Sequence, residues 1–198
     1  GKYFTQRPDG RDIFQEMQAQ GYRVARSWEK AGALPSGKTL VVAAPGNLPP
    51  PSKRGDVFRQ AAVKALDTLS RNPNGFFLMI EGSNIDKAAH SNNLEEMMEE
   101  LLDFDRTAGA VLDWASKHPG TLVVITADHN TGAFALTGGS REQGEITGRF
   151  GSGSHDGVAV PVYAFGAGSG DFTGIYENTD IFNKIMNALK KGADKPVR

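Results

Sequence analysis

Cysteine is absent from the 198 residues of this chain, which excludes disulfides and thiolate ligands for a metal ion. Any metal site must therefore use histidine, aspartate, glutamate and water. Because a chain without cysteine tolerates reducing and oxidising surroundings alike, the composition leaves the compartment open. Long hydrophobic runs are also lacking. No stretch approaches the roughly 18 apolar residues of a membrane-spanning helix, so we expect no membrane partner.

The chain also lacks an excess of charge of either sign, with 22 lysine and arginine residues against 23 aspartate and glutamate residues. A nucleic-acid partner is usually marked by a basic patch or stripe, and we expect none here. The hydrophobic fraction of 39% and the length of 198 residues suffice for one domain with a sizeable core. We therefore predict a single domain over residues 1–198.

Helical and strand patterns alternate along the sequence. Apolar residues spaced three and four apart predict helices, and short continuous apolar runs predict buried strands. The predicted helices cover residues 12–20, 54–70, 94–117 and 181–189, and the predicted strands cover residues 22–25, 39–44, 76–80, 122–126 and 160–165. This alternation indicates an α/β fold with a largely parallel sheet and helices on both of its faces.

One segment does not fit this alternation. Residues 137–157 contain seven glycines in 21 positions and show no clear period. Structureless segments of that length are uncommon in compact domains and are usually functional or mobile. We therefore expect a long glycine-rich loop here.

Acidic residues accompany three of the four histidines. Asp86 and His90 are four positions apart just after a predicted strand, so one helical turn would put both side chains on the same face. Asp128 and His129 directly follow another predicted strand, and open α/β sheets place their sites at such strand ends. The third histidine, His155, lies near the end of the glycine-rich segment, which must then fold back toward the sheet.

Each pairing has an ordinary explanation when it is taken alone, because such pairs are common on solvated helix faces and in turns. Together with Glu81, they form a set of oxygen and nitrogen ligands rich enough for several divalent ions. Lys87 is either an exposed lysine on a first helical turn, which is the simpler explanation, or a cation beside an anionic substrate. The remaining histidine, His118, we interpret as a cation near the negative end of a helix.

These residues carry a resemblance. Glu81-Gly-Ser-Asn-Ile-Asp-Lys-Ala-Ala-His90, Thr126-Ala-Asp-His129 and Gly153-Ser-His-Asp-Gly157 resemble three motifs of the alkaline phosphatase family, in the order of that family. The resemblance implies an αβα sandwich with two zinc ions and one magnesium ion. It implies the following roles: Asp86, His90 and His155 for the first zinc, Asp128 and His129 for the second, Glu81 for magnesium, and Lys87 for the substrate phosphate.

The activity implied by the resemblance is hydrolysis of phosphate monoesters through a covalent phosphoserine. Two ions flank the phosphorus, one activating the serine and the other stabilising the departing oxygen. Members of the family are usually dimeric and exported, so the resemblance also implies a homo-oligomer and a periplasmic or secreted location. A phosphomutase or phosphodiesterase of the same superfamily is an alternative, although the Ile-Asp-Lys-x-x-His context disfavours it. A non-catalytic metal-binding module is a further alternative.

The sequence departs from the family at the nucleophile. The family's Asp-Ser-Ala motif precedes the three motifs above, and this chain contains no such tripeptide. We therefore expect the chain to be the C-terminal portion of a larger metallohydrolase, with an incomplete sheet, no catalytic serine and no activity alone. We also expect exposed strand edges and apolar helix faces, which favour self-association.

Overall fold

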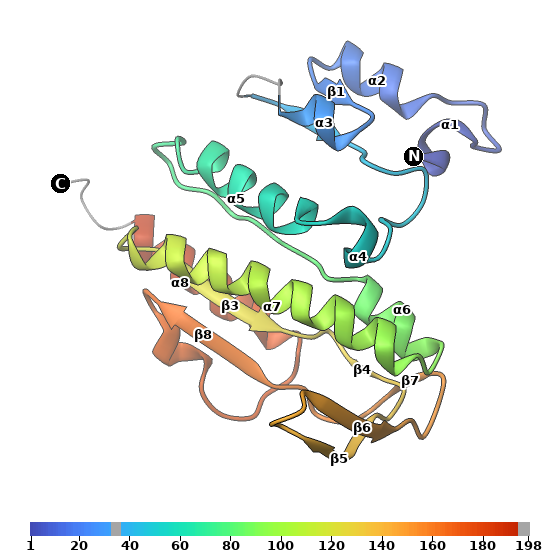
Figure 1. The fold of residues 1–198 in the computed structure, drawn as a ribbon. Coiled ribbons are helices and arrows are strands. Elements are labelled where there is room, and N and C mark those ends of the chain that lie inside the picture. The colour runs from blue at the N-terminus through green and yellow to red at the C-terminus, as the bar shows by residue number, and fades with distance from the viewer. Residues whose placement is uncertain (33–36, 194–198) are drawn as a thin grey trace. The chain divides into compact units, whose positions relative to one another are not determined.

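The computed structural model describes residues 1–32 and 37–193. The chain divides into two compact units, Gly1–Leu78 and Met79–Arg198, and most of their elements are labelled in Figure 1. The expected single domain over the whole chain stays a prediction. Within the described part of the chain, no helix is both long and apolar enough to cross a membrane.

The first unit is mostly helical. The side chain of Asp12 begins α2 by accepting hydrogen bonds from the backbone N–H groups of Phe14 and Gln15, and Phe14 is buried. Strands β1 and β2 pair in parallel, with Val24 opposite Leu40. The elements of this unit are α1 (Lys2–Thr5), α2 (Ile13–Ala19), β1 (Arg23–Ala25), α3 (Trp28–Ala31), β2 (Thr39–Val41), α4 (Pro51–Arg54) and α5 (Val57–Leu69).

The second unit contains all the predicted site residues. Its helices are α6 (Asn84–His90), α7 (Leu94–Ser116), the 3-10 turn η1 (Ser169–Phe172) and α8 (Asp180–Ala193). Its strands are β3 (Leu122–Thr126), β4 (Asn130–Thr131), β5 (Ala135–Ser140), β6 (Glu145–Arg149), β7 (His155–Asp156) and β8 (Val162–Gly166). The long helix α7 packs against both β3 and β8 (Figure 1).

The expected largely parallel sheet is wrong for the described residues. Their strands form four two-stranded sheets, and only β1–β2 is parallel. Strands β3 and β8 pair antiparallel, with Leu122 opposite Gly166 and Thr126 opposite Val162. The apolar run at 122–126 correctly predicted a strand, but this strand is only partly buried and its partner is antiparallel.

The predicted strand at residues 76–80 is also wrong. This segment makes no strand pairing, and the side chains of Phe77 and Met79 are 62% and 75% exposed. A β-strand requires a neighbouring strand to bond its backbone groups, and none among the described residues pairs with this one. The apolar composition therefore predicted a buried strand, whereas this segment is unpaired and its residues alternate between partly buried and exposed.

The expected long loop at residues 137–157 is wrong as well, because much of it is paired. Strands β5 and β6 form an antiparallel hairpin with a register shift near Gly138, and β7 pairs with β4. The hairpin escaped the period-two pattern because glycines occupy positions where side chains would alternate. At Gly148 a Cβ atom would overlap the ring of Phe134, so the aromatic ring occupies the space of the missing side chain.

A small apolar core fixes the helix that begins the site. Ala88 and Ala89 of α6 are buried with Met97 of α7. Around them pack the partly buried side chains of Ile85, Leu94, Phe134 and Phe150. The amide of Asn84 adds a hydrogen bond to the Glu100 carboxylate, at 3.1 Å. Helix α6 is therefore held against α7 along one face, which leaves its other face for chemistry.

Candidate metal centre

Helix α6 presents Asp86 and His90 on the face opposite its buried alanines. The two residues are one turn apart, and His90 Nε2 lies 3.4 Å from Asp86 Oδ1. This is the convergence that their spacing predicted. His90 is exposed and Asp86 is half-buried, so the pair is open to a ligand from solvent.

His155 joins this pair from a distant part of the chain. Strand β7 places it opposite Thr131 of β4, and its Nε2 lies 3.0 Å from His90 Nε2 and 3.4 Å from Asp86 Oδ1. The three residues offer ligand atoms that all lie within 4.8 Å of one another. The structure therefore brings together the three residues predicted to share one ion.

The hydrogen bonds around the cluster fix which atoms face inward. His90 Nδ1 lies 2.8 Å from the carbonyl oxygen of Gly153. Because a carbonyl oxygen only accepts, Nδ1 carries the proton and Nε2 keeps its lone pair toward Asp86 and His155. A backbone carbonyl that orients a histidine in this way is the usual arrangement around a metal ligand.

The donor set fits a small divalent cation. Two ligand atoms of a tetrahedral zinc site with bonds of 2.0–2.1 Å are separated by about 3.3–3.4 Å. The observed separations of 3.0, 3.4 and 3.4 Å among these atoms of Asp86, His90 and His155 are close to that edge length. Three protein ligands on one side, with the other side open, are typical of catalytic zinc sites.

A buried threonine connects this cluster to the second predicted pair. Thr131, only 9% exposed, places its hydroxyl oxygen 2.6 Å from Asp86 Oδ1 and 3.2 Å from His129 Nδ1. A carboxylate only accepts, so the hydroxyl donates to Asp86 and accepts the N–H of His129. The Nε2 lone pair of His129 is then free to bind an ion.

Sequence reasoning missed Thr131, because β4 is only two residues long and His129 lies in a bend before it, so no period-two pattern marked this position.

His129 and Asp128 lie directly beside the first cluster. His129 Nε2 is 3.2 Å from Asp128 Oδ2, and the His129 ring stacks on that of His155 with centroids 3.6 Å apart. Two adjacent ligand groups can therefore form here, as two-metal chemistry requires.

Two other predicted site residues are not part of this network. Glu81 and Lys87 are exposed, and within the described residues no hydrogen bond or ion pair joins either side chain to the cluster. His118 also lies elsewhere, at the end of α7. Its ring stacks on Trp114 at 3.7 Å, and its Nδ1 lies 2.7 Å from the Trp114 carbonyl oxygen.

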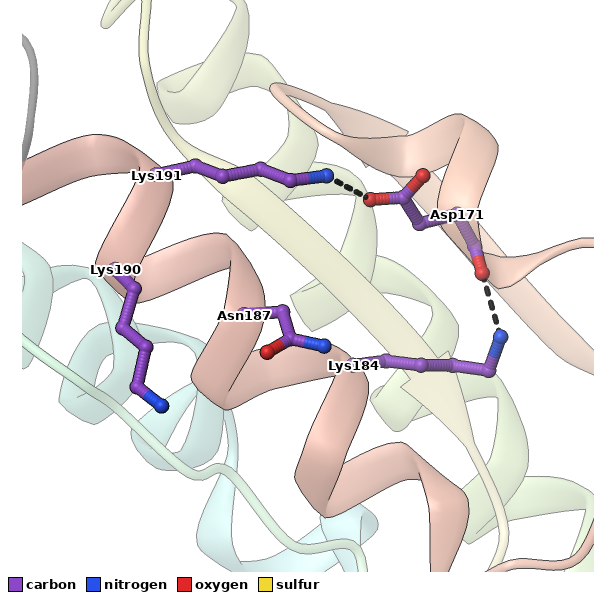
Figure 2. Close-up of a pocket in the computed structure, with 5 residues that line it drawn as sticks. All are labelled: Asp171, Lys184, Asn187, Lys190 and Lys191. Atoms are coloured by element: carbon purple, nitrogen blue, oxygen red, sulfur yellow. Dashed lines mark hydrogen bonds and ion pairs between the residues drawn. The ribbon is translucent and has the colours of Figure 1, made fainter.

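An open pocket of about 490 Å³ lies apart from these residues, between η1 and α8. Figure 2 shows that two of its lysines are engaged with Asp171. Lys184 donates to the carbonyl oxygen and Lys191 pairs with the carboxylate, at 2.7 and 2.9 Å. Asn187 and Lys190 complete the lining. Because this pocket is lined by no histidine and by a single carboxylate that is paired with Lys191, we place the candidate chemistry at the histidine cluster.

Comparison with known proteins gives consistent matches. Residues 2–148 match the family model described as alkaline phosphatase. Alkaline phosphatase 4 of Bacillus subtilis (strain 168) is 27% identical over 97% of this chain and 57% of its own length. Streptomycin-6-phosphate phosphatase of Streptomyces griseus is 31% identical over 91% of this chain and 51% of its own length.

Solved structures agree. The alkaline phosphatase of the Antarctic bacterium TAB5 superposes with a TM-score of 0.85 at 33% identity, covering 96% of this chain and 58% of that one. A mutant of that enzyme, determined with Mg bound in its M3 site, gives a TM-score of 0.84 at 32% identity, with the same coverage of 96% and 58%. The chain thus spans about half the length of the relatives it matches.

Proposed function

Because the chain belongs to the alkaline phosphatase family, we propose that it supplies the metal-binding part of an enzyme that hydrolyses phosphate monoesters. One observation carries this proposal. Asp86, His90 and His155 direct three ligand atoms at one point, with a second carboxylate–imidazole pair stacked against them. Family membership supports hydrolysis of phosphate monoesters as the reaction that such a pair of ligand groups would serve.

We assign the ligands as follows: Asp86, His90 and His155 bind one zinc ion, Asp128 and His129 bind a second, and Glu81 contributes to a magnesium site. The absence of thiolates suits this set, since imidazole and carboxylate are ligands for zinc and carboxylate for magnesium. A bound pair of such ions supplies Lewis-acid stabilisation of the attacking and leaving oxygens. The Mg-bound structure of a relative at 32% identity supports divalent-ion chemistry in the family.

The chain's own residues would orient the reaction. Asp86 and His90 are fixed on α6, and the Thr131 hydroxyl holds the carboxylate of Asp86. Lys87, exposed on the same helix, would place a cation beside the substrate phosphate. The sequence holds no serine in an Asp-Ser-Ala context, so we expect this chain to lack the nucleophile and to be inactive alone.

Metal binding tests the site directly. Cobalt(II) titration of the unaltered chain should give the visible absorption of a tetrahedral nitrogen and oxygen site, and zinc should displace it. His155→Ala should abolish this signal because it removes one of three convergent ligands. The matched control is His118→Ala, which removes a histidine that stacks on Trp114 at the end of α7. Loss of the signal in both variants, or in neither, would reject the assignment.

Activity tests the reaction. The chain supplied with zinc and magnesium should hydrolyse p-nitrophenyl phosphate no faster than the free ions. The product of the complete reading frame that contains this sequence should hydrolyse the monoester and not bis(p-nitrophenyl) phosphate. Preference for the diester would favour the phosphodiesterase alternative, and inactivity toward both would favour a non-catalytic metal-binding module.

Two further proposals concern assembly and location. Phe182, Met186 and Leu189 form an exposed stripe along α8 at helical spacing, which supports self-association into a homo-oligomer such as a dimer. Light scattering that gives the mass of a monomer at all concentrations would reject it. We propose a periplasmic or secreted location by analogy with the family, and fractionation of the source cells would test it.

A further inference from the structure

The carboxylate of Asp156 collects hydrogen bonds from three separate groups. The Asn130 amide lies 3.1 and 2.9 Å from its two oxygens. The backbone N–H of Ala133 donates at 2.9 Å and that of Val158 at 3.1 Å. The Asn130 amide first, and then the backbone N–H groups, hold the pKa of the Asp156 carboxyl below its ordinary value. This carboxylate is therefore a node that joins residues 130–133 to residues 156–158.

Asp156 follows the proposed ligand His155 directly in β7. In the β4–β7 pair, Thr131 is opposite His155 and Asn130 is opposite Asp156. Because successive side chains in a strand point to opposite faces, His155 faces the cluster and Asp156 faces away from it. Asp156 therefore acts on the imidazole through the backbone that carries both residues.

The pair of strands needs this support because it is only two residues long. His155 is preceded by the sequence Gly151-Ser-Gly-Ser, and glycine loses more backbone freedom on ordering than any other residue. The other two ligands, Asp86 and His90, come from one helix and are positioned together. The position of His155 depends instead on how firmly β7 is attached to β4.

Backbone hydrogen bonds hold the residues that precede β7, but they do not involve His155 itself. Gly132 N–H donates to the Ser154 carbonyl at 3.0 Å, and the N–H of Gly151 donates to the Gly132 carbonyl at 3.0 Å. These bonds hold the residues before His155. After His155, the side chains of Asp156 and Asn130 bond β7 to β4. We call this contact the clamp.

We propose that Asp156 is the positioning residue for His155, and that its clamp across β4–β7 presets the third ligand of the metal site before an ion binds. The inference rests on the proposed metal centre and adds a residue that does not touch the ion. A preset ligand costs less to order on binding, so loosening the clamp should weaken metal affinity while leaving the ligand atoms intact.

The test compares zinc dissociation constants, measured by competition with a chromophoric chelator, for the full chain and its variants. Asp156→Asn should weaken zinc binding by up to about 10-fold, less than the roughly 10–100-fold cost of removing a group that bonds a ligand directly, because Asp156 acts on His155 through the backbone. Asn130→Ala, which leaves Asp156 in place, should weaken it in the same direction and by less. Asp171→Asn, which removes an exposed aspartate paired with Lys191, is the matched control and should leave affinity unchanged.

Two measurements separate positioning from a general loss of structure. Hydrogen exchange of the metal-free Asp156→Asn protein should accelerate at residues 151–157 and stay unchanged in α6. The double variant Asn130→Asp with Asp156→Asn restores an amide–carboxylate pair across the strands and should recover part of the lost affinity. If Asp156→Asn does not fold, Asn130→Ala decides the question.

The outcomes are distinct. Zinc affinity of Asp156→Asn and Asn130→Ala equal to that of the unaltered chain would overturn the role of Asp156 and leave the metal centre standing. An equal loss of affinity in Asp171→Asn would also overturn it. An unaltered chain that binds no zinc would overturn the proposed centre itself.

Discussion

Replacing Thr131 with valine removes a single hydroxyl from the centre of the site. Valine has nearly the same shape, and the position is 9% exposed, so packing against neighbours is preserved. The change deletes the O–H that donates to Asp86 Oδ1 at 2.6 Å and the oxygen that accepts from His129 Nδ1 at 3.2 Å. It therefore disturbs a ligand of each proposed zinc ion at once.

The expected magnitude follows from the charge of the acceptor. A hydrogen bond to a charged group contributes about 1.5–3 kcal/mol, which corresponds to roughly 10–150-fold in an equilibrium constant. The carboxylate of Asp86 is half-buried, so water can replace part of the lost bond, and we expect the lower half of that range. Loss of outer partners of metal ligands usually costs about 10–100-fold in affinity, which agrees.

The assay is zinc affinity by chelator competition, with the midpoint of thermal unfolding measured on the metal-free protein. Thr131→Ser is the control because it keeps the hydroxyl and loses only the methyl group. We expect Thr131→Val to bind zinc more weakly than Thr131→Ser, with both variants folded. Equal affinities of the two variants would refute the role of the hydroxyl. Weaker binding by serine than by valine would show that packing of the methyl group matters more.

Three further predictions concern the scaffold. Gly166→Ala should lower the free energy of unfolding by about 2–4 kcal/mol, measured by urea denaturation, because a Cβ atom would overlap the Thr121 carbonyl oxygen at a φ of +90°. Asn93→Ala should cost about 1 kcal/mol in the same assay, since the Asn93 side chain caps the start of α7. The hydrogen bond from Arg7 lowers the pKa of Asp9 to about 2, so Asp9 contributes stability above its ordinary pKa of 3.8 and loses it as the pH falls through about 2. The stability difference between the unaltered chain and Asp9→Asn should therefore vanish in strong acid, and a difference that grew there would contradict the assignment.

The longer helices were predictable because local spacing decides them, whereas the four-residue helices α1 and α3 were not expected. The expected helix at 94–117 is observed as Leu94–Ser116, and Asp12 caps the helix that was expected to begin there. Both signals lie within one or two turns of the residues they describe. The strand at 122–126 was also found at its predicted bounds, whereas the equally long apolar run at 76–80 is not a strand, because an apolar run alone does not supply a pairing partner.

Strand pairing was not predictable from the same information. The direction of β8 beside β3 and the register of β7 beside β4 depend on contacts between residues far apart in sequence. The glycine-rich hairpin adds a second difficulty, because glycines at 138, 139 and 148 erase the alternation that marks a strand. Pairing must therefore be read from the structure.

In the candidate site, too, the local relation between residues was predictable and the long-range one was not. Asp86 and His90 could be placed together from their spacing of four, because a helical turn fixes their relation. Their convergence with His155 could not be predicted, since it requires β4 and β7 to pair in one register. A shift of one residue would turn Asp156 toward the cluster and His155 away from it.

The same dependence on register distinguishes the two faces of the two-residue strand pair that carries the proposed metal centre. One face of β4–β7 carries Thr131 and His155, which bond to or converge on Asp86. The opposite face carries Asn130 and Asp156, which bond to each other. One face of the strand pair therefore carries the proposed metal ligand, and the opposite face carries the side-chain bond that joins the two strands. Substitutions on the two faces should separate accordingly: those at Thr131 should alter zinc affinity with little change in exchange of the strand amides, whereas those at Asn130 should alter both.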